Sequence, residues 1–475
     1  MNPMLLTLFL AATSLHAQPT VLLQRAQSGD VEAQGELATR YLFGEGVVQD
    51  FAKAREWFAK AAVQGNAKAQ YSLGVLYERG IGMAQDYGKA HEWYEKAAAQ
   101  GNADAQHNLG VLYEQGKGVA QDYDKAYEWI EKSAAQGYAQ AQFALGVLYM
   151  KGAGVAQDDD KAREWYEKAA AQGYAQAQFV LGVMYMEDLG EAQNSAKAIE
   201  WIEKAAAQGF VEAQFNLGLL HFHGKGVAQD YAKAREWWEK AAAQGLGEAQ
   251  FNLGVLYEKG IGGTQDYGKA REWYEKAAVQ GHADAQNFLG VLYEKGEGVA
   301  QDYGKAREWF EKAAAQGNAQ AQYNLGVLYV KGAGVAQDYG KAHEWYEKAA
   351  AQGNAAAQYN LGVLYERGEG VAQDYGKARE WYEKAAAQGY AAAQFNLGVL
   401  YKEGISVAQD YGKAREWWEQ AAVQGLVQAQ YNLGVMYRMG VGVTRDYGKA
   451  REWWEKAAAQ GLVEAWLALQ ELPRE

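Results

Sequence analysis

A tryptophan that returns every 36 residues is the feature that most constrains this chain. It stands at Trp57, Trp93, Trp129, Trp165, Trp201, Trp237, Trp273, Trp309, Trp345, Trp381, Trp417 and Trp453. The Gln of an Ala-Gln pair keeps the same step from Gln34 to Gln430, without an insertion or deletion. A fixed period of about 20 to 50 residues is typical of repeat arrays. The number of domains therefore cannot be estimated from the length of 475 residues.

The unit at residues 67–102 shows how one copy folds. It reads AKAQYSLGVLYERGIGMAQDYGKAHEWYEKAAAQGN and divides at its glycines into two stretches. Apolar residues recur at i, i+4 and i+7 in the first stretch, which predicts a helix over 67–79 that Gly80 ends in a left-handed conformation. Asp86 is typical of the residue that caps a helix start, so it predicts the beginning of the second helix.

Small and large residues alternate where the two helices of a unit are expected to meet. Gly74 and Ala90 predict close approach of the helix axes, and we expect Trp93, Tyr77 and Leu73 to fill the volume beside them. One hairpin buries a single face, so each unit needs the next. The sequence therefore predicts an all-α chain, a right-handed α/α superhelical solenoid of about twelve 36-residue helix-turn-helix repeats.

The two ends of the array differ from its interior. We expect a lead-in at residues 18–30, repeats over 31–461 and a C-terminal capping helix within 462–475. Trp466 replaces the usual glutamine in this last helix. Three leucines are expected to cover the last exposed face: Leu467, Leu469 and Leu472.

The first 17 residues resemble a secretory signal peptide. An apolar run from Met4 to Leu15 is followed by His16 and the small Ala17, where cleavage is expected. The run is too short to span a bilayer, which needs roughly 20 apolar residues, and no later run is longer. We therefore expect a periplasmic or secreted protein with no transmembrane segment in the mature chain.

Composition excludes several kinds of function. A formal net charge of -13 argues against nucleic-acid partners, which require a dense basic face. The absence of cysteine excludes disulfides, thiolate metal sites and cysteine nucleophiles. No constellation of catalytic or metal-ligating residues is found, and no cofactor is expected. The acidic run Asp158-Asp159-Asp160 lacks the spaced ligands and glycine of a calcium loop, so drift in one copy is the favoured interpretation.

The unit resembles the Sel1-like repeat, a relative of the tetratricopeptide repeat with a longer turn between its helices. The pattern that carries the resemblance is A-x-A-Q-x-x-L-G-x-x-Y-x-x-G-x-G-V-x-Q-D-Y-x-K-A-x-E-W-x-x-K-A-A-x-Q-G, over about residues 31 to 465. The resemblance implies an adaptor in assembly, signalling or quality control, and exported bacterial members are similar to envelope and host-interaction factors. A cysteine-rich branch is associated with penicillin binding, and this chain has none of those cysteines.

The resemblance also implies where a partner binds, because the first helix of each such unit lines a concave groove. The slot just before Leu-Gly, which often contacts the partner backbone, holds an amide in seven copies: Asn108, Asn216, Asn252, Asn324, Asn360, Asn396 and Asn432. Such amides can pair with an extended peptide. An aromatic residue precedes this slot in most copies. Tyr323, Tyr359 and Phe395 are expected to line the groove together with the asparagines. The other members of this aromatic row are Tyr71, Phe143, Phe179, Phe215, Phe251 and Tyr431.

Two interpretations of these residues stay open. The rings either form an apolar groove floor or pack between neighbouring repeats, and the asparagines either face the groove or bond to neighbouring groups. The amide row is interrupted at Ser72, Ala144, Val180 and Phe288. Specificity is expected where copies differ, above all in the fourth and fifth.

The favoured function is an exported, non-catalytic scaffold that binds a protein or peptide partner in its groove. The alternative is a protein that binds glycan or peptidoglycan through the aromatic row. An enzyme of the β-lactamase type is the third hypothesis, and it lacks a nucleophile with an adjacent base.

Overall fold

The computed structural model describes residues 19–187 and 192–473, and the signal peptide expected at residues 1–17 lies outside them. The described residues form 26 helices and no strand. Their bounds are α1 (Pro19–Gln27), α2 (Val31–Phe43), α3 (Phe51–Val63), α4 (Ala67–Arg79), α5 (Tyr87–Ala99), α6 (Ala103–Gln115), α7 (Tyr123–Ala135), α8 (Ala139–Lys151), α9 (Asp159–Ala171), α10 (Ala175–Glu187), α11 (Ala192–Ala207), α12 (Val211–His223), α13 (Tyr231–Ala243), α14 (Gly247–Lys259), α15 (Tyr267–Val279), α16 (Ala283–Lys295), α17 (Tyr303–Ala315), α18 (Ala319–Lys331), α19 (Tyr339–Ala351), α20 (Ala355–Arg367), α21 (Tyr375–Ala387), α22 (Ala391–Glu403), α23 (Tyr411–Val423), α24 (Val427–Met439), α25 (Tyr447–Ala459) and α26 (Val463–Gln470).

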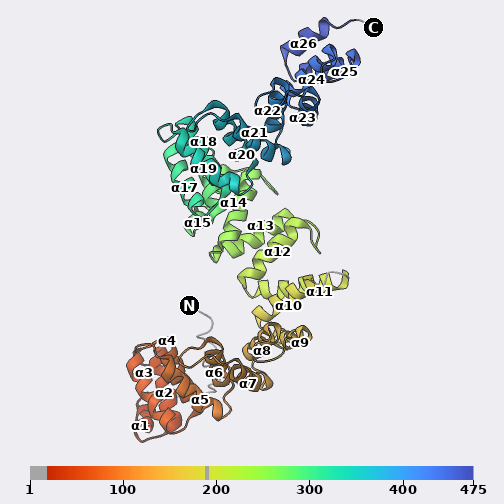
Figure 1. Cartoon of the computed structure of the whole chain (residues 1–475). Coiled ribbons are helices and arrows are strands. Elements are labelled where there is room, and N and C mark those ends of the chain that lie inside the picture. Colours follow the sequence, from red (N-terminus) through yellow and green to blue (C-terminus); the bar gives the residue numbers. More distant parts are fainter. Residues whose placement is uncertain (1–18, 188–191, 474–475) are drawn as a thin grey trace. The chain divides into compact units, whose positions relative to one another are not determined.

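From α1 to α12 and again from α14 to α26, each helix packs against the next one along the chain, as the helix pairs in Figure 1 show. The even-numbered helices from α2 to α24 are the first helices of their repeats, and the odd-numbered helices from α3 to α25 are the second ones. The chain divides into two compact units, Met1–Trp237 and Trp238–Glu475, and each unit is such a stack. The expected all-α solenoid of helix-turn-helix repeats is confirmed.

Local sequence sets the ends of the helices. Gly80 follows α4 with a φ of 66°, and the Oδ1 atom of Asp86 accepts a hydrogen bond of 3.0 Å from the Lys89 amide at the start of α5. The predicted helix over 67–79 is therefore confirmed to the residue. The hydrogen bond from the Lys89 amide lowers the pKa of Asp86.

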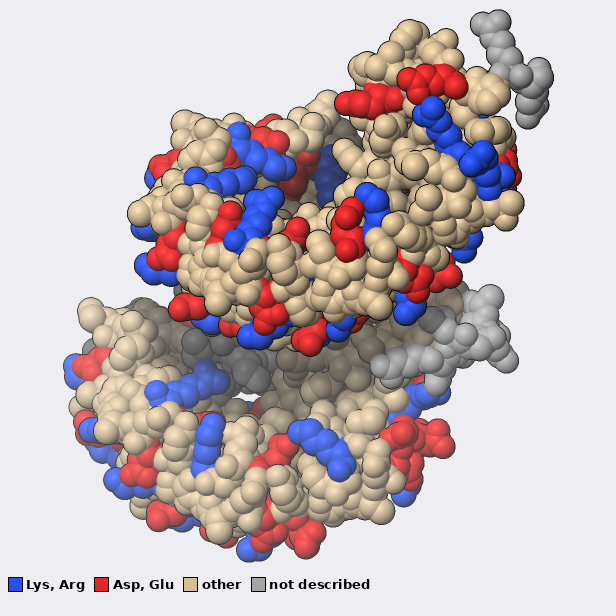
Figure 2. All heavy atoms as spheres, turned by 45° about the horizontal axis from the view of Figure 1, so that its top comes forward, with Lys and Arg blue, Asp and Glu red and all other residues tan. Residues whose placement is uncertain are grey.

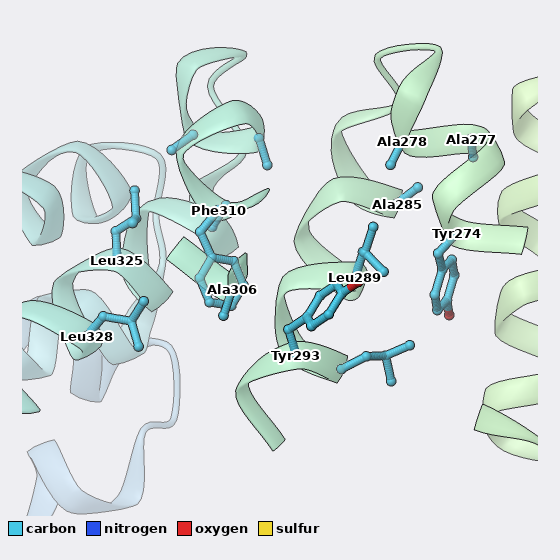
Figure 3. Close-up of a cluster of buried hydrophobic side chains, with 14 of the residues drawn as sticks. Tyr274, Ala277, Ala278, Ala285, Leu289, Tyr293, Ala306, Phe310, Leu325 and Leu328 are labelled. Atoms are coloured by element: carbon cyan, nitrogen blue, oxygen red, sulfur yellow. The ribbon is translucent and has the colours of Figure 1, made fainter. Parts of the chain in front are cut away.

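The core is built around the residue that follows each repeated tryptophan. This position is buried in all twelve copies: Phe58, Tyr94, Ile130, Tyr166, Ile202, Trp238, Tyr274, Phe310, Tyr346, Tyr382, Trp418 and Trp454. Figure 3 shows two of them, Tyr274 and Phe310, among the small alanines and the leucines of neighbouring helices.

In ten repeats the glycine of the Leu-Gly pair lies beneath this buried side chain. A Cβ atom at Gly74 would lie 2.6 Å from the Tyr94 ring, so the close approach expected at Gly74 is confirmed. The expectation for Trp93 was wrong in part, because Trp93 is only half-buried and Tyr94 occupies the core. Lys96 lies over the Trp93 ring, with Nζ 4.1 Å from its centroid.

A buried glutamine links the two helices of each repeat to the repeat before it. In α18, the Nε2 atom of Gln322 donates to the carbonyl of Ala314, at the end of the preceding second helix, over 3.3 Å. Its Oε1 atom accepts from the Nε2 atom of Gln352, which directly follows the second helix of its own repeat, over 2.8 Å. The sequence indicated the register of this glutamine and did not reveal its role.

Replacing Gln322 with leucine is expected to lower the free energy of unfolding by about 1 to 2 kcal/mol, because the Ala314 carbonyl and the Gln352 amide lose their partner. Gln320 lies exposed two residues earlier in the same helix, so Gln320→Ala is the matched control and is expected to change stability by less than about 0.5 kcal/mol. Chemical denaturation followed by circular dichroism measures both changes. Equal effects of the two substitutions would contradict the structural role of the buried amide.

Ser406 is the one described non-glycine residue with a positive φ, of 60°. The equivalent position one repeat earlier is Gly370, whose φ is 73°. A side chain in this conformation costs roughly 1 kcal/mol, so Ser406→Gly is expected to stabilise the protein by about that amount. The reciprocal change Gly370→Ser is expected to destabilise it. Thermal melts measure the stability of the two variants. A fall in melting temperature with Ser406→Gly would contradict the expectation that Ser406 is strained.

The two ends of the array are closed in different ways. Leu22 and Ala26 of α1 are buried against the first repeat, so the lead-in forms part of the stack. At the other end Leu472 is buried, as expected, whereas Leu467 is 52% exposed. The expectation that Leu467 covers the last face was therefore wrong. In interior repeats the residue at this position packs on a ring of the second helix that follows. No second helix follows α26 in the described residues, so Leu467 has no such ring to pack on.

Candidate functional site: the face of the first helices

One side of each first helix is only half-buried, and we call this the first-helix face. In α20 it comprises Tyr359, Asn360, Val363 and Glu366, all of them half-buried. The opposite side of the helix is the buried one, as the 0% exposure of Leu361 illustrates. The spacing of i, i+4 and i+7 on a helix produces this separation. The first-helix face thus holds the predicted rings and amides together.

The aromatic row is neither fully exposed nor fully packed. The rings are half-buried, and seven of them rest on the buried ring of the second helix in their own repeat. Phe179 packs on Phe210, because the second helix of its repeat has Ile202 at this position. Ring centroids are 5.8 Å apart for Tyr323 and Tyr346, and 5.7 Å apart for Tyr359 and Tyr382. Phe395 stacks on Trp418 at 6.1 Å. Both open interpretations of the rings are therefore partly correct: one side of each ring packs within its repeat and the remainder stays accessible.

Three of the predicted asparagines lie beside the tyrosine core of the preceding repeat. The Nδ2 atom of Asn108 donates to the Tyr94 hydroxyl over 3.2 Å. Burial raises the pKa values of Tyr346 and Tyr382, and the nearby amides of Asn360 and Asn396 offset part of this effect.

Two further asparagines bond elsewhere because the preceding repeat offers no hydroxyl at these positions. Asn324 donates to the Oδ1 atom of Asn287 over 3.0 Å, and Asn216 donates to the Glu212 carbonyl of its own helix over 2.8 Å. These amides help to join or order the repeats, and that role leaves them fewer groups for a partner.

Asn252 and Asn432 remain without a hydrogen bond from their side chains within the described part of the chain. The reason for Asn432 is visible in the preceding repeat, which carries Phe395 and Trp418 in place of tyrosines. The indole nitrogen of Trp418 donates to the Phe395 carbonyl over 3.0 Å and offers no acceptor. Both asparagines are half-buried and keep their full hydrogen-bonding capacity. They are the predicted residues best prepared to bind a ligand.

His107 takes the ring position in the third repeat, which the prediction of an aromatic row did not include. Its ring contacts Tyr138 edge-on, with centroids 5.5 Å apart. Burial lowers the pKa of His107 to about 4, so the imidazole is neutral at pH 7 and packs like the other rings. The signal that could have found it is the 36-residue register itself, which places His107 in line with Tyr71 and Phe143.

Three glutamates on this face bond to core tyrosines, and the sequence did not single them out. The hydroxyls of Tyr94, Tyr274 and Tyr382 each donate to a glutamate Oε2 atom over 2.5 Å, and the acceptors are Glu78, Glu258 and Glu366 respectively. Each glutamate precedes its tyrosine by 16 residues, and the pairs could have been predicted from this constant spacing. These carboxylates are half-buried and bring negative charge beside the rings.

Charge is otherwise mixed on the surface. Figure 2 shows basic and acidic side chains interspersed over the visible face. Asp158, the first residue of the acidic run, accepts a hydrogen bond from the Lys161 amide and thus caps α9. Across residues 19–187 and 192–473, no group of three or more His, Asp or Glu side chains is placed to hold a metal ion. The helices in the same residues are all too short or too polar to cross a membrane.

Comparison with known proteins agrees with the repeat and its fold. The Sel1 repeat family model matches twelve consecutive segments: residues 31–66, 67–102, 103–138, 139–174, 175–210, 211–246, 247–282, 283–318, 319–354, 355–390, 391–426 and 427–462. No curated protein matches this chain in sequence.

Two solved structures are similar over most of their length. One is c5321, a protective antigen present in uropathogenic Escherichia coli strains that displays an SLR fold; it is 39% identical, with a TM-score of 0.78, over 96% of this chain and 97% of that one. The other is a Sel1 repeat protein from Oxalobacter formigenes, which is 37% identical, with a TM-score of 0.56, over 65% of this chain and 90% of that one. With twelve matched repeats and these two relatives, the chain belongs to the Sel1 repeat family.

Proposed function

We propose that this protein is an exported, non-catalytic scaffold that holds a segment of a partner protein against its first-helix face. The observation that carries the proposal is the combination of half-buried rings with two amides, Asn252 and Asn432, that have no hydrogen-bonding partner in the described chain. An extended peptide offers backbone groups to such amides and apolar side chains to such rings. Sel1 repeat proteins are commonly protein-interaction scaffolds, which supports the proposal.

The geometry of the rings favours a peptide over a sugar. Tyr323 and Tyr359 are tilted by 33° and 34° against the core rings beneath them and are half-buried. A stacked sugar ring needs a flat, open aromatic platform, whereas an apolar side chain fits between tilted rings. Glycan or peptidoglycan binding remains the alternative occupant.

Site-specific photo-crosslinking tests the proposed face. A photoreactive phenylalanine analogue at Asn432 is expected to capture a partner from an envelope extract, because the amide position lies on the binding face. The same analogue at Glu344, an exposed residue of the second helix α19, is the matched control and is expected to capture little. Mass spectrometry compares the products. Equal products from both positions, or none from either, would refute this binding face.

Export is the second part of the proposal. It rests on the apolar run that ends at Leu15 and on the small Ala17 at the expected cleavage point. The mature chain recovered from the periplasm or medium is expected to begin at Gln18, which N-terminal mass spectrometry measures. Recovery of the intact chain in the cytoplasm would refute export without affecting the binding face.

A further inference from the structure

The seventh and eighth repeats break the pattern of the first-helix face in one place. The usual order of a ring followed by an asparagine is reversed in α16, where Asn287 precedes Phe288. Asn287 is buried, with 5% exposure, and Phe288 is half-buried at the position where most other copies hold the amide. An aromatic ring therefore enters a row that holds an asparagine in seven copies.

Phe288 completes a cluster of four rings, which we call the ring cluster: Phe251, Tyr274, His282 and Phe288. Centroids of Phe288 lie 5.6 Å from Phe251 and 5.5 Å from Tyr274. Phe251 also stacks on His282 at 4.7 Å. Elsewhere on this face an asparagine bonds to the core tyrosine, as Asn108 does to Tyr94. At Tyr274 the ring of Phe288 takes that place. Phe251, Tyr274 and Phe288 lie on the neighbouring helices α14, α15 and α16, and His282 caps the start of α16 in the same compact unit.

A carboxylate adjoins the ring cluster. The Tyr274 hydroxyl donates to the Oε2 atom of Glu258 over 2.5 Å, and Glu258 has no cation within 4.0 Å in the described chain. The second carboxylate oxygen, Oε1, is left for another donor. The three helices that carry the rings, α14, α15 and α16, have six carboxylates, on Glu248, Glu258, Glu272, Glu275, Asp284 and Glu294, against five cationic groups, on Lys259, Lys269, Arg271, Lys276 and Lys295. These helices therefore carry one net negative charge, and Glu258 is a carboxylate that no cation of the described chain neutralises within 4.0 Å.

We propose that the ring cluster and Glu258 bind an arginine or lysine side chain of the partner segment. Aromatic faces attract cations, and a half-buried carboxylate that lacks a cation completes the site. The planar guanidinium of arginine suits it best, because it can stack on Phe288 and donate to Glu258 at the same time. Asn252, next to Phe251 in the chain, supplies an amide for the backbone of the same segment. This inference rests on the proposed function and adds the chemistry of the partner: a basic, extended segment.

The repeat array provides its own control for the test. Glu366 accepts the same 2.5 Å hydrogen bond from Tyr382, but the following repeat has Asn396 where the ring cluster has Phe288. Glu258→Gln and Glu366→Gln thus remove the same charge from the same kind of hydrogen bond, and only the first removes it beside the ring cluster. Phe288→Asn restores the amide found in most other copies and removes the ring without touching the charge.

Fluorescence anisotropy with a labelled glycine-serine peptide that carries arginines measures the binding. The matched probe has citrulline in place of arginine, which keeps the shape and removes the charge. We expect the arginine peptide to bind at least about 10-fold more tightly than the citrulline peptide, a difference that Glu258→Gln removes. Phe288→Asn is expected to weaken the arginine peptide as well, whereas Glu366→Gln leaves its affinity within about 2-fold.

Three results would overturn the proposal: no binding of the arginine peptide, equal binding of both peptides, or equal losses in the Glu258 and Glu366 variants. Thermal melts of each variant show that a lost affinity is not lost folding. Failure here is distinguishable from failure of the proposed function, because crosslinking at Asn432 reports a partner whether or not that partner is basic.

Discussion

Replacing Phe310 with alanine is expected to lower the free energy of unfolding by about 3 to 5 kcal/mol, because it removes a large ring from a closely packed core. Phe310 has 0% exposure and lies between the helices of two neighbouring repeats, among Ala306, Leu289 and Leu325 (Figure 3). A ring in this position cannot be replaced by water, since the cavity is apolar. Denaturation by urea, followed by circular dichroism, measures the change.

Trp309, the neighbour of Phe310, is the matched comparison. Trp309→Ala is expected to cost only about 1 to 2 kcal/mol, because the indole is half-buried and keeps Lys312 over its outer face. The distance from the Lys312 Nζ atom to the ring centroid is 3.9 Å. The residue that repeats without change is thus expected to matter less for stability than the varied residue after it. A larger loss for Trp309→Ala than for Phe310→Ala would show that the core is assigned to the wrong position.

Gly254→Ala is the second substitution with a large expected effect. A Cβ atom at Gly254 would lie closer than 3.0 Å to the Tyr274 ring, which is itself fully buried. Because neither helix backbone nor ring has room to move, overpacking is expected to cost about 1 to 3 kcal/mol. The loss appears as a lower midpoint in the denaturation curve.

The same helix offers a control for this substitution. Gly247 also lies in α14, and a Cβ atom there meets no other atom within 4 Å. Gly247→Ala is therefore expected to leave stability unchanged or to raise it by about 0.5 kcal/mol, since alanine favours the helix. Equal losses for the two variants would mean that helix propensity, and not the close approach to Tyr274, explains the effect at Gly254.

Local chemistry explains why the helices could be predicted so closely. Asp86 and Gly80 act on backbone groups within a few residues of themselves, so their effects do not depend on what packs against the helix. Their recurrence with a 36-residue step extends one prediction to the whole array. The first-helix face could be predicted in the same way, because a helix places i, i+4 and i+7 on one side.

Packing explains what could not be predicted. Trp93 and Tyr94 are adjacent aromatic residues, and helical periodicity alone does not decide which of them faces the next repeat. The structure places Tyr94 in the core and Trp93 at its margin. The asparagine row divides for a similar reason: each amide is used or left unused according to the side chain that the preceding repeat presents. Asn108 meets the Tyr94 hydroxyl and donates to it, and Asn432 meets no such hydroxyl.

The sequence by itself determined the repeat, its 36-residue register, the helix ends and the side of the helices that carries rings and amides, because these depend on periodicity and on short-range backbone chemistry. Only the tertiary structure decided which aromatic residue forms the core, which asparagines keep unused hydrogen-bonding capacity, and that Phe288 and Glu258 meet around Tyr274. Those outcomes depend on distances between residues of different helices. Such distances are set by how side chains of neighbouring repeats fill shared space.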